Sequence, residues 1–200
     1  MRSGKLLHQS AKKESPEKIA KLILAKLKEK ADPKKADQGQ KFFKEEVRLY
    51  GISARDIYNL EKDIYQRLKP SWNVSDAIRL CEILLPNPYT EAKSMAVLIL
   101  ERFSDEFPGE LFFKVEEWLS ANYCDNWAVV DSLCPRVMES LFLKFPELSE
   151  KIAGWTLSPN RWLRRASAVS LILLARKGRM LDAAYKISER LLQCQGLSQP

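Results

Sequence analysis

Residues 126–145 read NWAVVDSLCPRVMESLFLKF, a helical apolar pattern that contains one unexpected charge. Side chains three and four residues apart share one face of a helix. The spacing therefore predicts a helix with Trp127 and Asp131 on one inward face. The apolar stripe on that face continues through Cys134, Val137, Met138, Leu141 and Phe142. An unpaired charge in such a stripe costs several kcal/mol, so Asp131 requires either a functional or a structural explanation.

Helical patterns extend over most of the chain, whereas strand signals are nearly absent. The sequence has no sustained alternation of apolar and polar residues and no Asn-Gly or Asp-Gly hairpin turn. Short Pro, Asn or Ser breaks separate about ten predicted helices. These helices cover residues 16–31, 37–50, 53–69, 74–85, 90–107, 110–119, 126–145, 146–157, 159–177 and 180–193.

The short connections predict how these helices are arranged. Consecutive helices pair as antiparallel hairpins, and no single pair can close a core. Stacked pairs of about 40 residues predict an all-α fold, a right-handed α-α superhelix that resembles a HEAT-like repeat solenoid. A plain globular helix bundle is the alternative architecture. We expect one HEAT-like repeat domain over residues 15–200, preceded by a basic flexible tail over residues 1–14.

Composition narrows the class of protein. No apolar run approaches the roughly 20 residues that a membrane helix needs, so we expect no membrane partner. The N-terminus is polar and Lys-rich, without the apolar segment of a secretion signal. The four cysteines form no CxxC pair, and three lie inside apolar helical patterns. Reduced thiols in a cytoplasmic protein fit this pattern better than disulfides or a zinc site.

The scarcity of histidine and of glycine motifs excludes several kinds of site. The only histidine is His8, in the polar tail, so catalysis by Ser-His-Asp or Cys-His and a histidine-rich metal centre are excluded. No GxGxxG or GxxxxGK loop is present, which makes a nucleotide cradle unexpected. We therefore expect neither a metal nor a cofactor.

The formal charge of +7 is unevenly distributed. Residues 1–35 carry eleven Lys/Arg and four Asp/Glu, a net charge of +7, and residues 154–200 carry eight and two, a net charge of +6. Residues 36–153 are correspondingly acidic. Two basic regions indicate a polyanion partner. For the tail, a solvated segment that binds nothing in particular is the alternative.

One basic cluster, SPNRWLRRA at residues 158–166, lies at a predicted helix start. Exposed N–H groups and partial positive charge at a helix N-terminus favour phosphate. Arginine forks fit phosphate oxygens, and a tryptophan can pack against sugar or base. The cluster predicts contacts to DNA from Arg161, Trp162, Arg164 and Arg165. The alternatives are a solvated cluster or an arginine paired with Asp131, which would keep that carboxylate ionised and oriented.

Trp127 and Asp131 also fit one particular reaction. A glycosidic bond breaks through an oxocarbenium-like transition state, which a carboxylate stabilises electrostatically. An indole face attracts cations by about 0.5 to 2 kcal/mol. A purine alkylated at N3 or N7 is already cationic, so its departure needs no general acid. The structural alternative is that Asp131 caps a neighbouring helix or pairs with an arginine between repeats.

The first aromatic patch, Phe42 and Phe43 followed by residues 50–52, has two interpretations. Aromatic side chains near the start of a repeat array can touch a base, but such residues are more often part of the core.

At these residues the chain resembles the AlkD-type DNA alkylation repair family, DNA glycosylases built from HEAT-like repeats. The resemblance covers residues 40–177. Its motifs are W-x-x-x-D-S at residues 127–132, LFLKFPEL at 141–148, W-L-R-R-A at 162–166 and the weaker patch from Phe42 to Ile52. It implies hydrolysis of the N-glycosidic bond of cationic purines of the 3-methyladenine and 7-methylguanine type. It also implies that Asp131 is the catalytic carboxylate, Trp127 an aromatic wall and Arg165 a group near the DNA backbone.

The expected partner is double-stranded DNA containing alkylated bases, bound by a monomer. Two departures from the family pattern stand out. Phe42 replaces a family tyrosine, and residues 181–200 contain no counterpart of a later Gly-Trp-Leu-Arg-like motif. We therefore expect a C-terminally shortened member with an incomplete concave surface. The alternative function is a non-catalytic HEAT-like module that binds DNA or a protein partner, with Asp131–Arg165 as a structural ion pair only.

Overall fold

The regular structure is helical throughout the described part of the chain, as predicted. The computed structural model describes residues 13–195, which contain eleven α-helices, two 3-10 helices and one isolated β-bridge, but no strand. The α-helices are α1 (Pro16–Glu29), α2 (Pro33–Gln40), α3 (Ala54–Leu68), α4 (Val74–Leu84), α5 (Thr90–Glu101), α6 (Leu111–Ser120), α7 (Trp127–Lys144), α8 (Leu148–Lys151), α9 (Arg161–Val169), α10 (Ile172–Arg176) and α11 (Leu181–Gln195). The 3-10 helices are η1 (Ser104–Glu106) and η2 (Ile152–Leu157).

Most long helices begin at a polar capping residue. The first N–H groups of a helix have no acceptor within the helix. The side-chain oxygen of the capping residue accepts a hydrogen bond from one of them. Proline follows the cap of α1 and of α2, where its missing N–H has no cost. The capping residues are Ser15, Asp32, Ser53, Asn73, Asn126 and Asn160.

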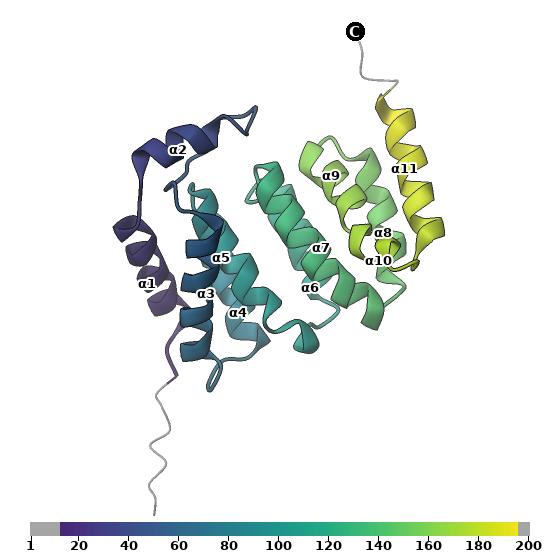
Figure 1. Cartoon of the computed structure of the whole chain (residues 1–200). Coiled ribbons are helices and arrows are strands. Elements are labelled where there is room, and N and C mark those ends of the chain that lie inside the picture. Colours follow the sequence, from purple (N-terminus) through teal and green to yellow (C-terminus); the bar gives the residue numbers. More distant parts are fainter. Residues whose placement is uncertain (1–12, 196–200) are drawn as a thin grey trace, which may run out of the picture.

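Each helix packs mainly against helices close to it in sequence. One row runs α3, α5, α7, α9, and each member contacts the next. Behind it, α1 packs against α4, α4 against α5, and α6 against both α7 and α9. Figure 1 shows this progression from the N-terminal helices to α11 at the opposite end. Such an arrangement is compatible with a helical solenoid, and its right-handed superhelical sense stays a prediction.

The core runs continuously between the rows and is rich in aromatic residues. Phe112 of α6 stacks on Trp155 of η2, with ring centroids 5.2 Å apart, and approaches Phe142 of α7 at 6.4 Å. Trp72 and Trp118 are also buried. Packing of large side chains from three elements at one point holds α7 in place.

Three cysteine thiols are buried and unoxidised. Cys81, Cys124 and Cys134 are free cysteines. Burial raises the pKa of each thiol, that of Cys124 to about 12. They are neutral core side chains and not nucleophiles.

The prediction of a helix over residues 37–50 is wrong. Helix α2 instead begins at Pro33 after the Asp32 cap and ends at Gln40, and an irregular segment follows. The side chain of Gln40 closes this segment into a loop, since its Nε2 donates to the Glu45 carbonyl at 2.8 Å and its Oε1 accepts from Val47 N at 2.9 Å. The loop is therefore fixed by side-chain bonds that helical periodicity does not reveal.

Three other predicted helices are shorter or divided. The helix predicted over 90–107 ends at Glu101, and the one over 146–157 is α8 followed by η2. The helix predicted over 159–177 is divided into α9 and α10. At this break, the hydroxyl of Ser167 donates to the Arg164 carbonyl and that of Ser170 to the Ala166 carbonyl, both at 2.6 Å. Such back-bonding bends helices.

The predicted basic tail falls almost entirely outside the described residues, as does His8. Lys13 and Glu14 are described and belong to the fold: Lys13 pairs with Asp76 at 2.7 Å, and Glu14 pairs with Arg67 of α3. No helix between residues 13 and 195 is long and apolar enough to cross a membrane. The same residues contain no group of three or more His, Cys, Asp or Glu side chains that could hold a metal ion.

Candidate functional site

The N-terminus of helix α7 is held in place by a buried asparagine. Asn126 accepts a hydrogen bond from Val129 N at 3.1 Å, and its Nδ2 reaches the Thr90 hydroxyl of α5 at 3.3 Å. Because the cap is tied to the neighbouring helix, the position of Trp127, the first residue of α7, is determined by core packing.

Trp127 and Asp131 lie on the same side of α7, but this side is not the inward face that the sequence predicted. Trp127 is 39% exposed and the Asp131 side chain 33% exposed. The stripe expected to continue from them is fully buried. The two residues therefore occupy the edge of the core, where solvent and a ligand can reach them, and the carboxylate does not carry the burial cost expected from the pattern.

Arg165 of α9 holds both oxygens of the Asp131 carboxylate. Its Nε donates to Oδ1 at 2.6 Å and its Nη2 donates to Oδ2 at 2.5 Å. The hydrogen bond to Asp131 raises the pKa of Arg165; burial opposes this shift, while the charges of Asp131 and Glu45 add to it. A bidentate fork fixes the plane of a carboxylate as well as its position. The pair leaves Asp131 oriented and the Arg165 side chain 41% exposed.

A proline lies one turn after Asp131 inside α7. Pro135 has no N–H, so the carbonyl of Asp131 receives no hydrogen bond from the residue four positions later. The α7 backbone thus lacks one helical hydrogen bond at the turn that carries the carboxylate. A proline within a predicted helix is a sequence signal that could have drawn attention to the turn of Asp131.

The three other members of the basic cluster behave differently. The guanidinium of Arg161 lies 4.2 Å from the centre of the Trp162 ring and 3.4 Å, by its Nη2, from Glu45 Oε1. Arg164 folds back, and its Nη1 donates to the carbonyls of Ser158 at 2.6 Å and Pro159 at 3.0 Å. Trp162 is only 8% exposed, so its indole belongs to the core and does not present the surface expected for packing against DNA.

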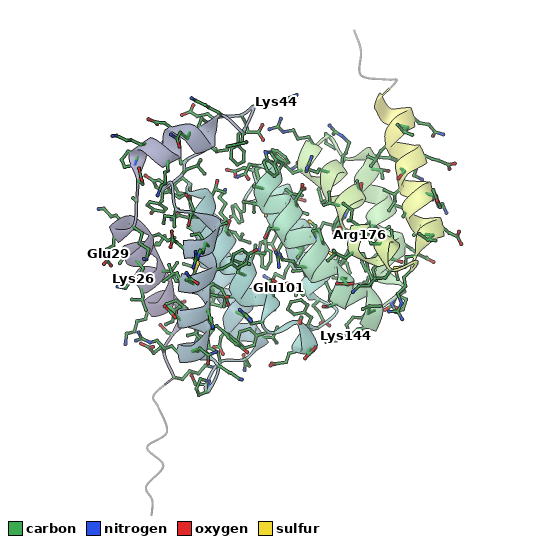
Figure 2. All side chains as sticks on the ribbon, viewed as in Figure 1. Lys26, Glu29, Lys44, Glu101, Lys144 and Arg176 are labelled. Atoms are coloured by element: carbon green, nitrogen blue, oxygen red, sulfur yellow. The ribbon has the colours of Figure 1, made fainter. Side chains whose placement is uncertain are left out.

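The loop after α2 reaches across to the start of α7. We refer to residues 41–47 as the strap. Phe43 of the strap stacks on Trp127, with ring centroids 5.3 Å apart and planes at 27°. Phe42 points elsewhere and is 78% exposed. Figure 2 places Lys44 at the outer end of the strap, beyond α2. The structure thus brings one of the two predicted aromatics to the Trp127 face.

The C-terminal end of this loop is anchored by a buried carboxylate. Glu91 of α5 accepts hydrogen bonds from the backbone N–H groups of Tyr50 at 2.9 Å, Gly51 at 2.8 Å and Ile52 at 3.3 Å. Gly51 has φ +78°, and a Cβ there would lie 2.2 Å from the Asp32 carbonyl oxygen. Only glycine fits this turn, which explains the Gly-Ile turn in the motif.

A pocket of about 470 Å³ adjoins the site on the side of α3 and α5. Ala128 and Ser132, the residues directly after Trp127 and Asp131, form one wall, and Phe43 forms part of another. Beyond it, Arg136 of α7 donates to Glu101 at 2.5 Å and to the Tyr58 hydroxyl at 3.3 Å, and Figure 2 shows Glu101 between α5 and α7. Neither Glu45 nor Arg136 was singled out in the sequence, because their partners lie far away along the chain.

A comparison with known families places the chain in one of them. The model of the DNA alkylation repair enzyme family matches residues 23–195, from the second half of α1 to the end of α11. The chain belongs to the DNA alkylation repair enzyme family. Membership supports a role in DNA repair with DNA as the substrate. No match was found among curated proteins.

Proposed function

We propose that this protein is a DNA glycosylase that releases cationic alkylated purines by hydrolysis of the N-glycosidic bond. One observation carries the proposal: a carboxylate held by an arginine fork lies one helical turn from an exposed indole, in a member of an alkylation repair family. The combination supplies an anion, an aromatic face and a cationic group within one exposed region.

Asp131 stabilises the positive charge that develops on the sugar. As the bond from C1′ to the purine nitrogen breaks, its electron pair stays with the base and neutralises it. The sugar becomes oxocarbenium-like, and an oriented anion lowers the free energy of that state. A water oxygen then bonds to C1′, and its proton passes to the carboxylate or to solvent.

Trp127 binds the cationic base before the bond breaks. An indole face attracts a cation more strongly than it attracts a neutral ring, so an alkylated purine is favoured over the unmodified base. The attraction weakens when the base leaves as a neutral molecule, which favours its release.

Arg165 and Arg161 contact the DNA backbone. Both lie near the N-terminus of α9, where unpaired N–H groups add to the positive potential. Arg164 contributes less than the sequence suggested, since one of its terminal nitrogens is occupied by carbonyls of its own chain.

The test is release of 7-methylguanine and 3-methyladenine from methylated duplex DNA. We expect release by the wild-type protein and a loss of about 100-fold or more for Asp131→Asn. Asp182→Asn, which removes a carboxylate in the first turn of α11, is the matched control and should retain the wild-type rate. Absence of release by the wild-type protein, with DNA binding intact, would favour the non-catalytic binding module.

A structural role for Asp131 predicts a different result. The Arg165 and Asp131 side chains are 41% and 33% exposed, so we instead expect loss of this ion pair to change the free energy of unfolding by no more than about 1 kcal/mol. If Asp131→Asn is strongly unstable in urea, the loss of release reflects loss of fold and the catalytic role of the carboxylate is not supported.

A further inference from the structure

The strap occupies the two places that the proposed substrate needs. Its Phe43 ring stacks on one face of the partly exposed Trp127 indole, the group that would receive the base. Its Glu45 carboxylate lies 3.4 Å from Arg161, a group that would receive a backbone phosphate. An aromatic ring and an anion two residues apart on one loop thus match the two chemical features of a nucleotide.

Glu45 is poorly satisfied where it lies. Its Oε1 atom is buried and has no hydrogen-bond partner, because the approach of Arg161 is close enough for an ion pair but lacks hydrogen-bond geometry. The charge of Glu45 also acts on Arg165. A buried carboxylate oxygen without a hydrogen bond is destabilised, so this contact is easily given up to a competing anion.

The strap is held at both ends by side-chain hydrogen bonds that do not involve the site. Gln40 closes it through the Glu45 carbonyl and Val47 N, and Glu91 fixes the chain after it at Tyr50 to Ile52. Between these two fixed points, its contacts with the site are the Phe43 stack and the Glu45 ion pair. Neither contact requires the helices to shift when it is broken.

We propose that the strap is an intramolecular competitor of the substrate, with Phe43 in the place of the base and Glu45 in the place of a phosphate. The inference rests on the proposed function for the identity of the displaced ligand. A ligand binds only to the fraction of molecules in which its part of the site is free, so each contact of the strap lowers apparent affinity by that fraction. The two contacts act separately: Glu45 opposes any duplex, whereas Phe43 opposes only DNA that places a base on Trp127.

The first arm of the test measures binding of unmodified duplex DNA by Glu45→Gln and Glu46→Gln. Both variants replace a glutamate by a glutamine and therefore change the net charge equally. Glu46 is the matched control because it is exposed and forms no ion pair within the described residues. We expect Glu45→Gln to bind about threefold more tightly than Glu46→Gln, as for release of a partly exposed ion pair. Equal affinities for the two variants, or no binding of DNA by any variant, overturn the competitor.

The second arm removes the aromatic ring. Phe43→Ala should increase acrylamide quenching of Trp127 fluorescence, with Trp127→Phe supplying the background of the four buried tryptophans. It should also bind a duplex carrying 7-methylguanine on a 2′-fluoro sugar, which slows bond cleavage, about fivefold more tightly and leave the affinity for unmodified duplex unchanged. Phe43→Leu keeps the apolar volume and should give the same direction if Phe43→Ala folds poorly.

The outcomes separate the two proposals. Base release by the wild-type protein, together with unchanged quenching in Phe43→Ala and equal affinities of Glu45→Gln and Glu46→Gln, overturns the strap but not the glycosylase. Increased quenching and tighter binding without any base release support the strap and overturn the glycosylase.

Discussion

Arg165 grips both carboxylate oxygens of Asp131 from a helix that follows α7, with the two residues 34 positions apart in the chain. The fork joins α7 to α9, and the same guanidinium remains partly exposed. One side chain therefore orients the proposed catalytic carboxylate and faces the solvent from which DNA arrives.

Replacement of Arg165 should separate two of its contributions, the orientation of the Asp131 carboxylate and the positive charge offered to DNA. Arg165→Lys keeps the positive charge but cannot hold two oxygens in one plane. We expect base release to fall about tenfold with DNA affinity retained, whereas Arg165→Ala should reduce both. Single-turnover rates and binding isotherms measure the two effects, and equal rates for Arg165→Lys and the wild type would show that the fork is not required.

The contribution of Trp127 should depend on the charge of the base. Trp127→Phe keeps an aromatic face with a weaker attraction for cations, and Trp127→Ala removes it. We expect affinity for alkylated duplex to fall about 2-fold to 30-fold in Trp127→Ala and less in Trp127→Phe. Affinity for unmodified duplex, measured alongside, should be nearly constant; a parallel loss for both duplexes would indicate a structural defect.

The backbone contacts should appear in the salt dependence of binding. Each phosphate neutralised contributes about −0.9 to the slope of log K against log salt concentration. If Arg161, Arg164 and Arg165 each neutralise one phosphate, the slope should be about −2.7. Arg161→Ala removes one of these contacts and should change the slope to about −1.8. Arg176→Ala, in α10, removes an equal charge outside the candidate site and should leave the slope unchanged. A flat dependence in the wild-type protein would exclude phosphate contacts.

The turn at Gly51 should tolerate no side chain. A methyl group there meets the Asp32 carbonyl and the Ala36 amide, and the backbone has a positive φ. We expect Gly51→Ala to destabilise the fold by about 1 to 3 kcal/mol. Gly154→Ala is the matched control, since a Cβ at that position meets nothing within 4 Å. Urea unfolding of both variants provides the measurement, and equal stabilities would contradict the close packing around Gly51.

The ion pair between Glu14 and Arg67 of α3 should weaken in acid. Hydrogen bonds from Arg67 and then Lys18 lower the pKa of Glu14 from 4.5 to about 2. Because the folded-state pKa is depressed, the stabilisation is complete above pH 4.5 and is lost as pH falls toward 2. Glu14→Gln should therefore be less stable than the wild type at pH 7 and equally stable near pH 2. A difference in urea midpoint that does not change with pH would contradict this contribution.

The sequence predicted the parts of the site that depend on local spacing. Helix α7 begins at Trp127, as its pattern indicates, and an arginine partner for Asp131 is one of the alternatives that the sequence leaves open. Predictions failed where contacts between distant residues decide the structure. Helical spacing predicted a helix over residues 37–50, but the Gln40 side chain closes the strap into a loop. Glu91 then holds the amides of residues 50–52 from about 40 positions further along the chain.

The exposure of Asp131 could not be inferred from periodicity alone. A side chain at the edge of an apolar stripe differs from one at its centre by a small rotation about the helix axis. Which of the two is buried depends on where α5 and α9 pack against α7, and these contacts lie far apart in the sequence.

The loop closure by Gln40 has a consequence for how such a protein can diverge. Because residues 41–47 are closed by one side chain and contribute little to the core, their length and composition can change while the helices stay as they are. Natural variation in this segment could therefore retune which damaged bases are accepted, with the chemistry at Asp131 inherited unchanged.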